Sequence, residues 1–382
     1  MNEHKVGIIM NGVTGRMGTN QHLLQSIVEI IKQGGVRIND HETIMPDPIL
    51  VGRNKGKLKS LCKISGIQKH TLYLDKALAD PQYTVYFDAQ TTSRRADAIK
   101  DAITARKHIY CETPLTSETE TALELYHKAS EARLKHGVVQ DKLWLPGIIK
   151  LRRLIETGFF GDILSIRGEF GYWVFEGDTI PSQHPSWNYR KEDAGGIIHA
   201  TLSHWRYMLD NLFGQVKSVS CIGATHIKDR INEHGNKYKS TAEDAAYTTF
   251  ELDNNVIAQF NASWCTRVRK DDLLNIQVDG TKGSAVVGTR DCFIQPYAAT
   301  PNVLWVPDIN NQNNYFTDWQ KLPEQETYDN PFKIQWELFL KHVVLGNPFR
   351  WNLLDGAKGV QLAEKGMESW VKKQWVSLPD LS

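Results

Sequence analysis

The sequence predicts an α/β protein with an N-terminal doubly wound Rossmann domain and a C-terminal α+β domain whose large sheet is mostly antiparallel. The 382 residues suffice for two domains at roughly 150 residues each. Strand and helix patterns alternate up to about residue 142, which is typical of βαβ units around a parallel sheet. Beyond that point several long runs alternate polar and apolar residues, and this pattern favours antiparallel strands with one exposed face.

Hydrophobic periodicity places the elements of the first part. Short apolar runs predict strands at residues 5–10, 49–51, 84–88 and 108–111. Apolar residues at helical spacing predict helices over residues 19–34, 54–63, 94–106 and 117–135. We therefore expect residues 1–142 to form a dinucleotide-binding domain, with its cleft at the carboxyl ends of the parallel strands.

The second part, residues 143–382, is expected to bind the substrate and to join copies of the chain. A helical pattern covers residues 148–157, and alternating runs predict strands at residues 164–174, 216–224, 245–252, 256–263 and 274–278. Helical patterns near residues 331–345 and 354–373 close the chain. A sheet without helices on both faces must cover its apolar side, so we expect a homodimer or homotetramer.

Composition excludes several classes of protein. Lys and Arg number 45 against 44 Asp and Glu, a net charge of +1, so the basic excess typical of nucleic-acid binding is absent. No apolar run approaches the ~20 residues that cross a bilayer, and we expect no membrane partner. The five cysteines form no CxxC pair, which argues against disulfides and structural zinc and favours a cytoplasmic protein. His199 and His204 lie five residues apart without an acid at a matching step, so we expect no metal site.

A glycine-rich turn follows the first predicted strand and precedes a helix. Its glycines are Gly12, Gly15 and Gly18, and the residues between them include Thr14, Arg16 and Met17. Glycine allows a tight turn and a close approach to a pyrophosphate, and the following helix N-terminus favours the anion. In this context the turn indicates a site for NAD or NADP, although a plain strand-to-helix turn is the alternative.

Arg53 bears on the choice between the two cofactors. It follows the second predicted strand, where an Asp or Glu usually binds the 2′-hydroxyl of NAD. A guanidinium there can pair with the 2′-phosphate of NADP, so the sequence leans slightly toward NADP. A solvated surface arginine is nearly as good an interpretation.

Several motifs together resemble the glucose–fructose oxidoreductase and inositol dehydrogenase (Gfo/Idh/MocA) family. The first is Glu112-Thr113-Pro114 after a strand, and the second is Glu192 to Gly196 followed by His204. The turn of residues 158–161 and the final segment of residues 355–370 also resemble that family, so the likeness covers nearly the whole chain. Residues 137–211 resemble members that act on sugars and glycosides. The resemblance implies a Rossmann fold, a nicotinamide cofactor bound partly by residues 112–114, and a homo-oligomer.

Two positions depart from the family pattern. The family's Glu-Lys-Pro motif has Thr113 in place of the lysine, which in typical members lies beside the nicotinamide and helps proton transfer. Four residues before His204 the family usually has an Asp, and this chain has Ala200. Neither a hydroxyl nor a methyl group replaces those charges.

The remaining candidate residues are those that could transfer a proton or bind a sugar. His204 is the main acid/base candidate, because histidine titrates near neutral pH. Lys142, at the end of a predicted strand over residues 138–142, is a second candidate that could supply the missing cation, or else it is a solvated lysine. Trp187 and Tyr189 could line a sugar pocket or pack in the core. His184 and Arg206 are weaker substrate-binding candidates.

Three functions compete. The first is an NAD(P)-dependent oxidoreductase that acts on a secondary hydroxyl of a sugar, glycoside or cyclitol. The second is a glycosidase or lyase of the same fold that retains its nicotinamide and works through a transient keto-sugar. The third is a dinucleotide-binding protein without catalysis. We favour the first, because the fold, the glycine turn and His204 all agree with it.

Overall fold

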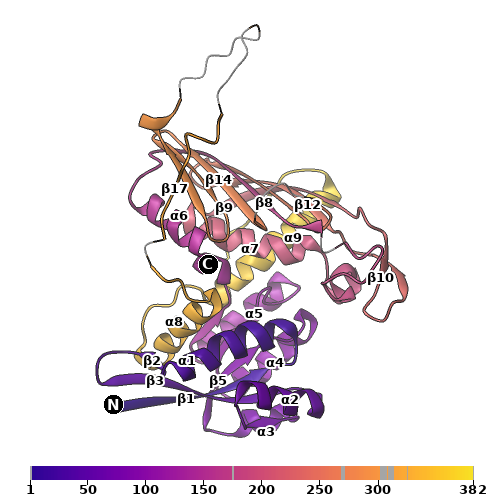
Figure 1. Ribbon diagram of the computed structural model, residues 1–382. Coiled ribbons are helices and arrows are strands. Elements are labelled where there is room, and N and C mark those ends of the chain that lie inside the picture. The colour runs from indigo at the N-terminus through magenta and orange to yellow at the C-terminus, as the bar shows by residue number, and fades with distance from the viewer. Residues whose placement is uncertain are drawn as a thin grey trace.

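The computed structural model describes residues 2–173, 176–267, 272–301, 308, 314–324 and 326–381. Figure 1 shows two sheets at opposite ends of the molecule, with helices packed between them. The sheet near the N-terminus is formed by early segments, and the other sheet by later ones. This arrangement confirms the predicted fold class.

The N-terminal sheet has the strand order β2-β3-β1-β5-β6-β7, with β4 beside β3. Every pair is parallel except β2 with β3. Residues 6–11 of β1 are all buried, as expected for a central strand covered on both faces. The carboxyl ends of β1, β5 and β6 therefore lie side by side. The strands are β1 (Asn2–Asn11), β2 (Val36–Arg37), β3 (Glu42–Val51), β4 (His70–Thr71), β5 (Tyr83–Asp88), β6 (His108–Cys111) and β7 (His136–Val138).

The helices around this sheet include one of unexpected type. The helix predicted over residues 19–34 is a π-helix, η1 (Gly18–Val28), followed by α1 (Glu29–Lys32). Hydrophobic periodicity indicates which face of a helix is buried, but it does not show whether the backbone hydrogen bonds run from i to i−4 or from i to i−5. The sequence therefore could not distinguish a π-helix from an α-helix. η1 buries two polar side chains, His22 and Ser26. The other helices are α2 (Lys55–Ser65), α3 (Leu74–Ala79), α4 (Thr92–Thr104) and α5 (Thr119–Glu131).

The predicted strand over residues 138–142 is shorter than expected. β7 ends at Val138, and residues 141–144 form a 3-10 helix, η2 (Asp141–Trp144), that carries Lys142. The backbone N–H of Gln140 donates to the Gln335 side chain at 2.7 Å rather than to a neighbouring strand. This side-chain partner ends the ladder and lets the chain turn toward the second sheet.

The second sheet has the order β17-β16-β15-β14-β8-β13-β12-β9-β18. Only β8 and β13 among these neighbours run parallel, so the sheet is mostly antiparallel. The strand predicted at residues 164–174 ends at Phe170, and residues 174–175 lie outside the described part. The strands are β8 (Ile163–Phe170), β9 (Val216–Ala224), β12 (Ala245–Leu252), β13 (Ile257–Ser263), β14 (Leu274–Gly280), β15 (Gly283–Val287), β16 (Cys292–Pro296), β17 (Gln320–Lys321) and β18 (Val376–Ser377), with β10 (Asp229–Ile231) and β11 (Lys237–Lys239) forming a separate hairpin.

Helices α6 (Pro146–Glu156), α7 (Ile197–Leu212) and α9 (Leu353–Lys372) cover the face of this sheet that points toward the N-terminal part (Figure 1). The opposite face exposes large apolar side chains, among them Ile222, Tyr247 and Ile257. Short 3-10 helices join the elements: η4 (Ser186–Tyr189), η5 (Lys191–Asp193) and η6 (Tyr297–Ala299). Within the described residues, no helix combines the length and apolar character needed to cross a membrane.

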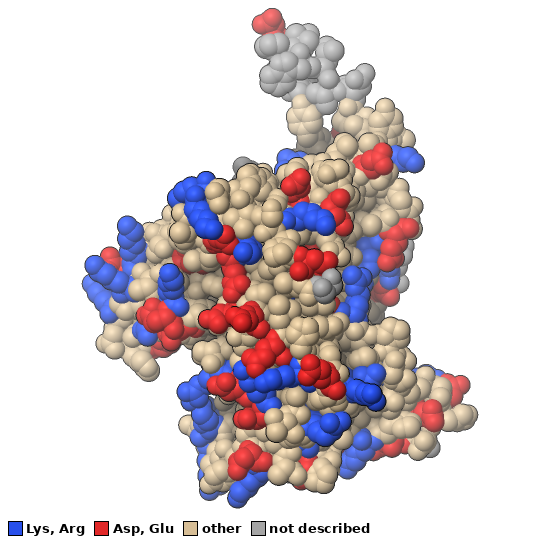
Figure 2. Space-filling model, turned by 180° about the vertical axis from the view of Figure 1, so that it is seen from behind, with Lys and Arg blue, Asp and Glu red and all other residues tan. Residues whose placement is uncertain are grey.

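Helix α8 (Pro331–Leu345) belongs by sequence to the second part but packs on the first sheet. Trp336 and Phe339 are fully buried in the same core cluster as Ile8 of β1. The C-terminal segment therefore fixes the N-terminal domain against the second sheet. Lys and Arg are mingled with Asp and Glu over the face shown in Figure 2, in keeping with the balanced net charge.

Candidate active site

A cavity of about 380 Å³ opens where the carboxyl ends of β1, β5 and β6 face helix α7. Both parts of the chain contribute to it, and a sheet switch point of this kind is the usual place for a ligand in α/β folds. The predicted site residues that line it are Gly15, Arg16, Met17, Glu112, Thr113, Pro114, Lys142, His184, Trp187 and His204. The sequence thus predicted residues that the fold brings together from five separate segments.

The glycine turn forms the cofactor side of the cavity. Gly12 has φ +81°, and a Cβ there would lie 2.6 Å from the backbone of Ala89. A Cβ on Gly18 would lie 2.7 Å from the Gly12 carbonyl oxygen. Gly15 is different, because its Cβ would meet only that carbonyl oxygen, at 3.4 Å, while the residue lines the cavity. Gly12 and Gly18 therefore keep the turn tight, and Gly15 leaves open space for a pyrophosphate beside a helix N-terminus.

Arg53 and Thr14 lie at the far end of this turn. A Cβ on Gly52 would lie 3.1 Å from the Thr14 methyl group, so the two segments touch. Arg53 follows β3 and is exposed. The next side chain, Asn54, accepts the backbone N–H of Lys57 at 2.9 Å and caps helix α2. Arg53 is thus an exposed guanidinium on a segment that touches the glycine turn.

A buried hydrogen-bonded chain supports the Glu112-Thr113-Pro114 turn. The Trp336 indole donates to His22 Nδ1 at 3.0 Å, so Nε2 carries the proton and donates to Glu112 at 2.7 Å. The other carboxylate oxygen accepts the Thr113 backbone N–H at 3.1 Å. Burial alone would raise the pKa of Glu112, but His22, Arg95 and this backbone N–H hold it below its ordinary value. The carboxylate is therefore an ionised anchor for the turn.

On the opposite wall, four polar side chains form a continuous chain of contacts. His204 Nδ1 lies 2.9 Å from the Tyr207 hydroxyl on the next turn of α7. That hydroxyl lies 3.4 Å from Asp141 Oδ1, and Lys142 Nζ lies 2.5 Å from Asp141 Oδ2. Burial, with a smaller effect of the Lys142 charge, lowers the pKa of His204 to about 4. The imidazole is therefore neutral at pH 7 and one of its ring nitrogens lacks a proton, but this pKa lies below the near-neutral value expected from the sequence, because the ring is buried.

Two predicted substrate residues lie outside the cavity. Tyr189 is fully buried, with the Arg230 guanidinium 3.8 Å above its ring. Arg206 is buried on the far side of α7, where it donates to Asp210 at 2.5 Å. Both side chains hold the second domain together, and we leave them out of the proposed site. His184 does line the cavity, and burial lowers its pKa to about 4.

Sequence reasoning missed residues after β5 and on η2. Gln90, Thr91 and Thr92 line the cavity because they follow a parallel strand, and that rule could have found them. Neither Asp141 nor Tyr207 was singled out from the sequence as a site residue. Their contacts join segments 66 residues apart, so no local pattern marks them. Asn188, Ala200 and Phe332 also line the cavity.

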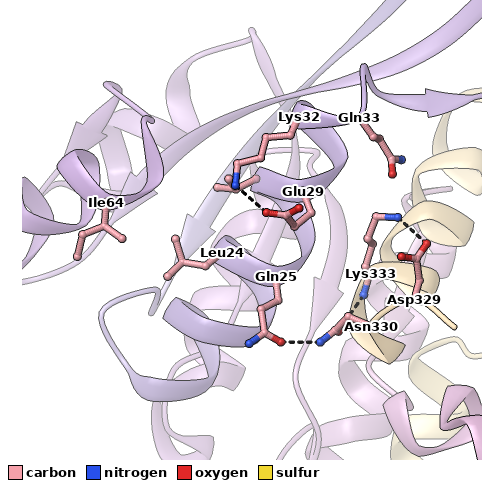
Figure 3. Close-up of a pocket in the computed structure, with 10 residues that line it drawn as sticks. Leu24, Gln25, Glu29, Lys32, Gln33, Ile64, Asp329, Asn330 and Lys333 are labelled. Carbon is pink, nitrogen blue, oxygen red and sulfur yellow. Dashed lines mark hydrogen bonds and ion pairs between the residues drawn. The ribbon is translucent and has the colours of Figure 1, made fainter. Parts of the chain in front are cut away.

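A larger hollow of about 710 Å³ lies between η1, α1 and the start of α8 (Figure 3). Several of its polar side chains are already paired with one another. Lys32 contacts Glu29 at 2.8 Å, and Asn330 donates to Gln25 at 2.7 Å. The smaller cavity is the better candidate, because its acid/base groups and the open glycine turn converge on one space. Among the described residues, no group of His, Cys, Asp or Glu is arranged to hold a metal ion.

The chain is similar to known sugar dehydrogenases. Residues 148–286 match the model of the GFO/IDH/MocA C-terminal domain. D-xylose dehydrogenase of Paenarthrobacter nicotinovorans is 47% identical over 381 residues, which cover 99% of this chain and 98% of that protein. Levoglucosan dehydrogenase of Pseudarthrobacter phenanthrenivorans is 22% identical over 352 residues, 83% and 85% of the two chains. A solved complex of levoglucosan dehydrogenase with NADH and levoglucosan has a TM-score of 0.81 at 19% identity, covering 99% of this chain and all of that one, and shows the shared fold.

The prediction of an oxidoreductase is confirmed by the D-xylose dehydrogenase relative. The prediction of a nicotinamide cofactor agrees with the NADH bound in the solved levoglucosan dehydrogenase complex. The glycine turn agrees with that cofactor, because it leaves open space at Gly15. The resemblance seen in the sequence is likewise confirmed, and the chain belongs to the GFO/IDH/MocA family.

Proposed function

We propose that this protein is an NAD(P)-dependent dehydrogenase that oxidises a secondary hydroxyl of a sugar, with D-xylose as the first substrate to test. One observation carries the proposal: His204 and Lys142 lie in the same cavity as the glycine turn and the Glu112-Thr113-Pro114 turn. A neutral imidazole can take the hydroxyl proton at the place where a nicotinamide would lie. The similarity to a D-xylose dehydrogenase supports a small aldose as the substrate.

Each wall has its own task. Gly15, Arg16 and Met17 would hold the pyrophosphate, and Glu112 keeps Thr113 in place on the wall where a nicotinamide would bind. When bound, the nicotinamide supplies the hydride acceptor. His204 receives the proton, and Lys142 provides positive charge on the wall opposite the position where the family lysine is missing. Positioning of the carbinol between these groups contributes most of the remaining rate.

The sugar side combines an aromatic face with polar groups. Trp187, His184 and Asn188 come from one segment, η4 and the residues before it, and all line the cavity. A ring face packs on the C–H groups of a sugar, and the imidazole and amide bond its hydroxyls. A cavity of about 380 Å³ shared with the nicotinamide fits a monosaccharide better than a long glycoside.

The experiment is a substrate panel with the purified protein. NADH or NADPH formation is followed by absorbance with D-xylose, other aldoses, cyclitols and glycosides, with NAD⁺ and NADP⁺ in turn. Reduction of free cofactor by an aldose supports the proposal. Glycoside cleavage by protein that retains its nicotinamide would instead identify the glycosidase or lyase, and cofactor binding without either activity would identify a non-catalytic protein.

We also propose that copies of the chain associate through the open face of the second sheet. Ile222 and Tyr247 are directly paired across β9 and β12, and both are exposed, at 57% and 43%. Adjacent apolar side chains of this size favour burial in a dimer or tetramer. Sedimentation at micromolar concentration tests this, and Ile222→Glu is expected to shift the protein toward a single chain. A single-chain mass for the wild type would contradict it.

A further inference from the structure

The two ring nitrogens of His204 have different surroundings. Nδ1 lies 2.9 Å from the Tyr207 hydroxyl, whereas Nε2 has no hydrogen-bond partner within the described residues. Because His204 lines the cavity, Nε2 is the nitrogen available to a substrate. A neutral imidazole accepts a proton only on the nitrogen that lacks one. The position of one proton on this ring therefore decides whether His204 can act as a base.

The Tyr207 hydroxyl has one proton to give and two candidate acceptors. They are His204 Nδ1 at 2.9 Å and Asp141 Oδ1 at 3.4 Å. The hydroxyl oxygen also accepts the Lys142 backbone N–H at 3.3 Å. If Tyr207 donates to Asp141, Nδ1 must carry a proton to fill the 2.9 Å contact. If Tyr207 instead donates to Nδ1, the imidazole proton lies on Nε2, and Asp141 Oδ1 no longer receives a hydrogen bond from Tyr207.

Burial and charge favour the first arrangement. The Asp141 side chain is 7% exposed, and Lys142 Nζ occupies its other oxygen at 2.5 Å. An ionised carboxylate only accepts hydrogen bonds, and a buried charge left without a donor costs more than a neutral ring nitrogen that faces a cavity. Burial, with Asp141 adding to it, raises the pKa of Tyr207 well above its ordinary value, so the phenol keeps its proton.

We propose that Asp141 and Tyr207 are positioning residues that hold His204 in the Nδ1–H tautomer and so make Nε2 the base for the substrate hydroxyl. The kinetic consequence rests on the proposed dehydrogenase function, whereas the tautomer itself does not. In the proposed reaction, the substrate hydroxyl would give its proton to Nε2, and the carbon that bears the hydroxyl would give a hydride to the oxidised nicotinamide that the glycine turn would hold. The substrate would become a carbonyl compound and His204 an imidazolium, with the cofactor taking up the two electrons.

The same chain of groups stabilises the imidazolium. The Nδ1–H bond to Tyr207 strengthens as the ring gains charge, and the Asp141 carboxylate lies behind the phenol. The charged groups facing His204 are Asp141 and Lys142 from η2 and Glu112 from the turn after β6, with Tyr207 on α7 itself. Two carboxylates therefore oppose the one ammonium. In this chain, η2 supplies the negative charge that Ala200 does not.

The tautomer can be measured without any turnover. Nitrogen-15 NMR of histidine-labelled protein distinguishes Nδ1–H from Nε2–H rings, and a His204→Asn variant assigns the signals. We expect Nδ1–H in the wild type. In Asp141→Asn the amide can donate to the phenol, which then donates to Nδ1, so the Nε2–H tautomer should appear. An Nε2–H ring in the wild type, or no change in folded Asp141→Asn, would overturn the proposal.

Kinetics give the second measurement. Asp141→Asn should lower kcat by 10²-fold or more, because an amide in place of an orienting carboxylate costs about 10⁴-fold in the serine protease triad. The KM for the cofactor should change less than twofold. Tyr207→Phe should also lower kcat, and it keeps the test valid if Asp141→Asn does not fold. Unchanged kcat in either folded variant of an active enzyme would contradict the assignment.

Tyr110→Phe is the matched control. It removes a hydroxyl that is buried and has no hydrogen-bond partner among the described residues, and its ring packs against Trp336 and Phe339. We expect wild-type kcat and the wild-type His204 tautomer. If the wild-type enzyme oxidises no sugar while His204 shows the Nδ1–H ring and its response to Asp141→Asn, only the proposed function fails.

Discussion

The two walls of the cavity are built on different principles. The cofactor wall, made of residues 12–18 and 112–114, is defined by backbone geometry: Gly12 and Gly18 have no room for a Cβ, and Gly15 leaves space for a ligand. The catalytic wall, made of η2 and α7, is defined by side chains that meet across the fold. Only the first kind of wall leaves a short motif in the sequence. If the two walls are separate, a substitution in one should leave the function of the other unchanged.

The largest effect is expected on the catalytic wall. His204→Asn should lower kcat by about 10²- to 10⁴-fold, the usual contribution of a general base. The dissociation constant of NAD(P)H should stay within twofold, because no residue of the cofactor wall forms a hydrogen bond with His204 within the described part of the chain. Cofactor fluorescence titration and steady-state rates measure the two quantities. A joint loss of binding and turnover would show that the walls are not separable.

A substitution on the cofactor wall is expected to weaken cofactor binding. Gly15→Val should weaken NAD(P)⁺ binding by more than about tenfold, since the added side chain would occupy the space of the pyrophosphate. The fold should survive, because a Cβ at this position meets only one atom, at 3.4 Å. Gly15→Ala should give a smaller loss in the same titration. Full affinity in a folded Gly15→Val protein would disprove the placement of the cofactor.

The contrast also explains what sequence could predict. The glycine turn, the strand that precedes it and the mostly antiparallel second sheet follow from local patterns, because each depends on neighbours in sequence. The π-helix η1 and the support of Glu112 by His22 and Trp336 do not. The Trp336–His22 bond joins residues 314 positions apart. Only the packing of α8 on the first sheet creates it.

An intermediate effect is expected at Thr113, which stands where the family usually has a lysine. In Thr113→Lys a second ammonium would enter a cavity that already contains Lys142. Like charges oppose each other, and more positive charge near His204 disfavours the imidazolium that forms during oxidation. We expect turnover to fall several-fold, with cofactor affinity little changed. Higher NAD(P)⁺ reduction would show that the missing lysine limits the reaction and that η2 does not replace it.

Stability should depend on pH through buried histidines on both sides of the molecule. Burial lowers the pKa of His136, His184 and His204 to about 4 each, against about 6.5 in an unfolded chain. The unfolded state then binds more protons between these values, so stability is full above about pH 6.5 and falls as the pH drops toward 4. Urea unfolding across this range measures the slope. His136→Asn should flatten it, and exposed His41→Asn should not.

The smallest effect concerns the far end of the cofactor wall. Arg53 is exposed after β3, and Asn54 beside it is engaged in capping α2. If Arg53 pairs with a 2′-phosphate, Arg53→Ala should lower kcat/KM for NADP⁺ by about three- to tenfold, the range for a charged hydrogen bond weakened by solvent. The value for NAD⁺ should not change, because its ribose offers no charge to the guanidinium. Lys59→Ala, which removes another exposed positive charge nearby on α2, is the control for the electrostatic potential of the surface as a whole. Equal losses of kcat/KM with both cofactors would mean that Arg53 contributes only to this electrostatic potential. Other residues of the cofactor wall would then determine the preference for NAD or NADP.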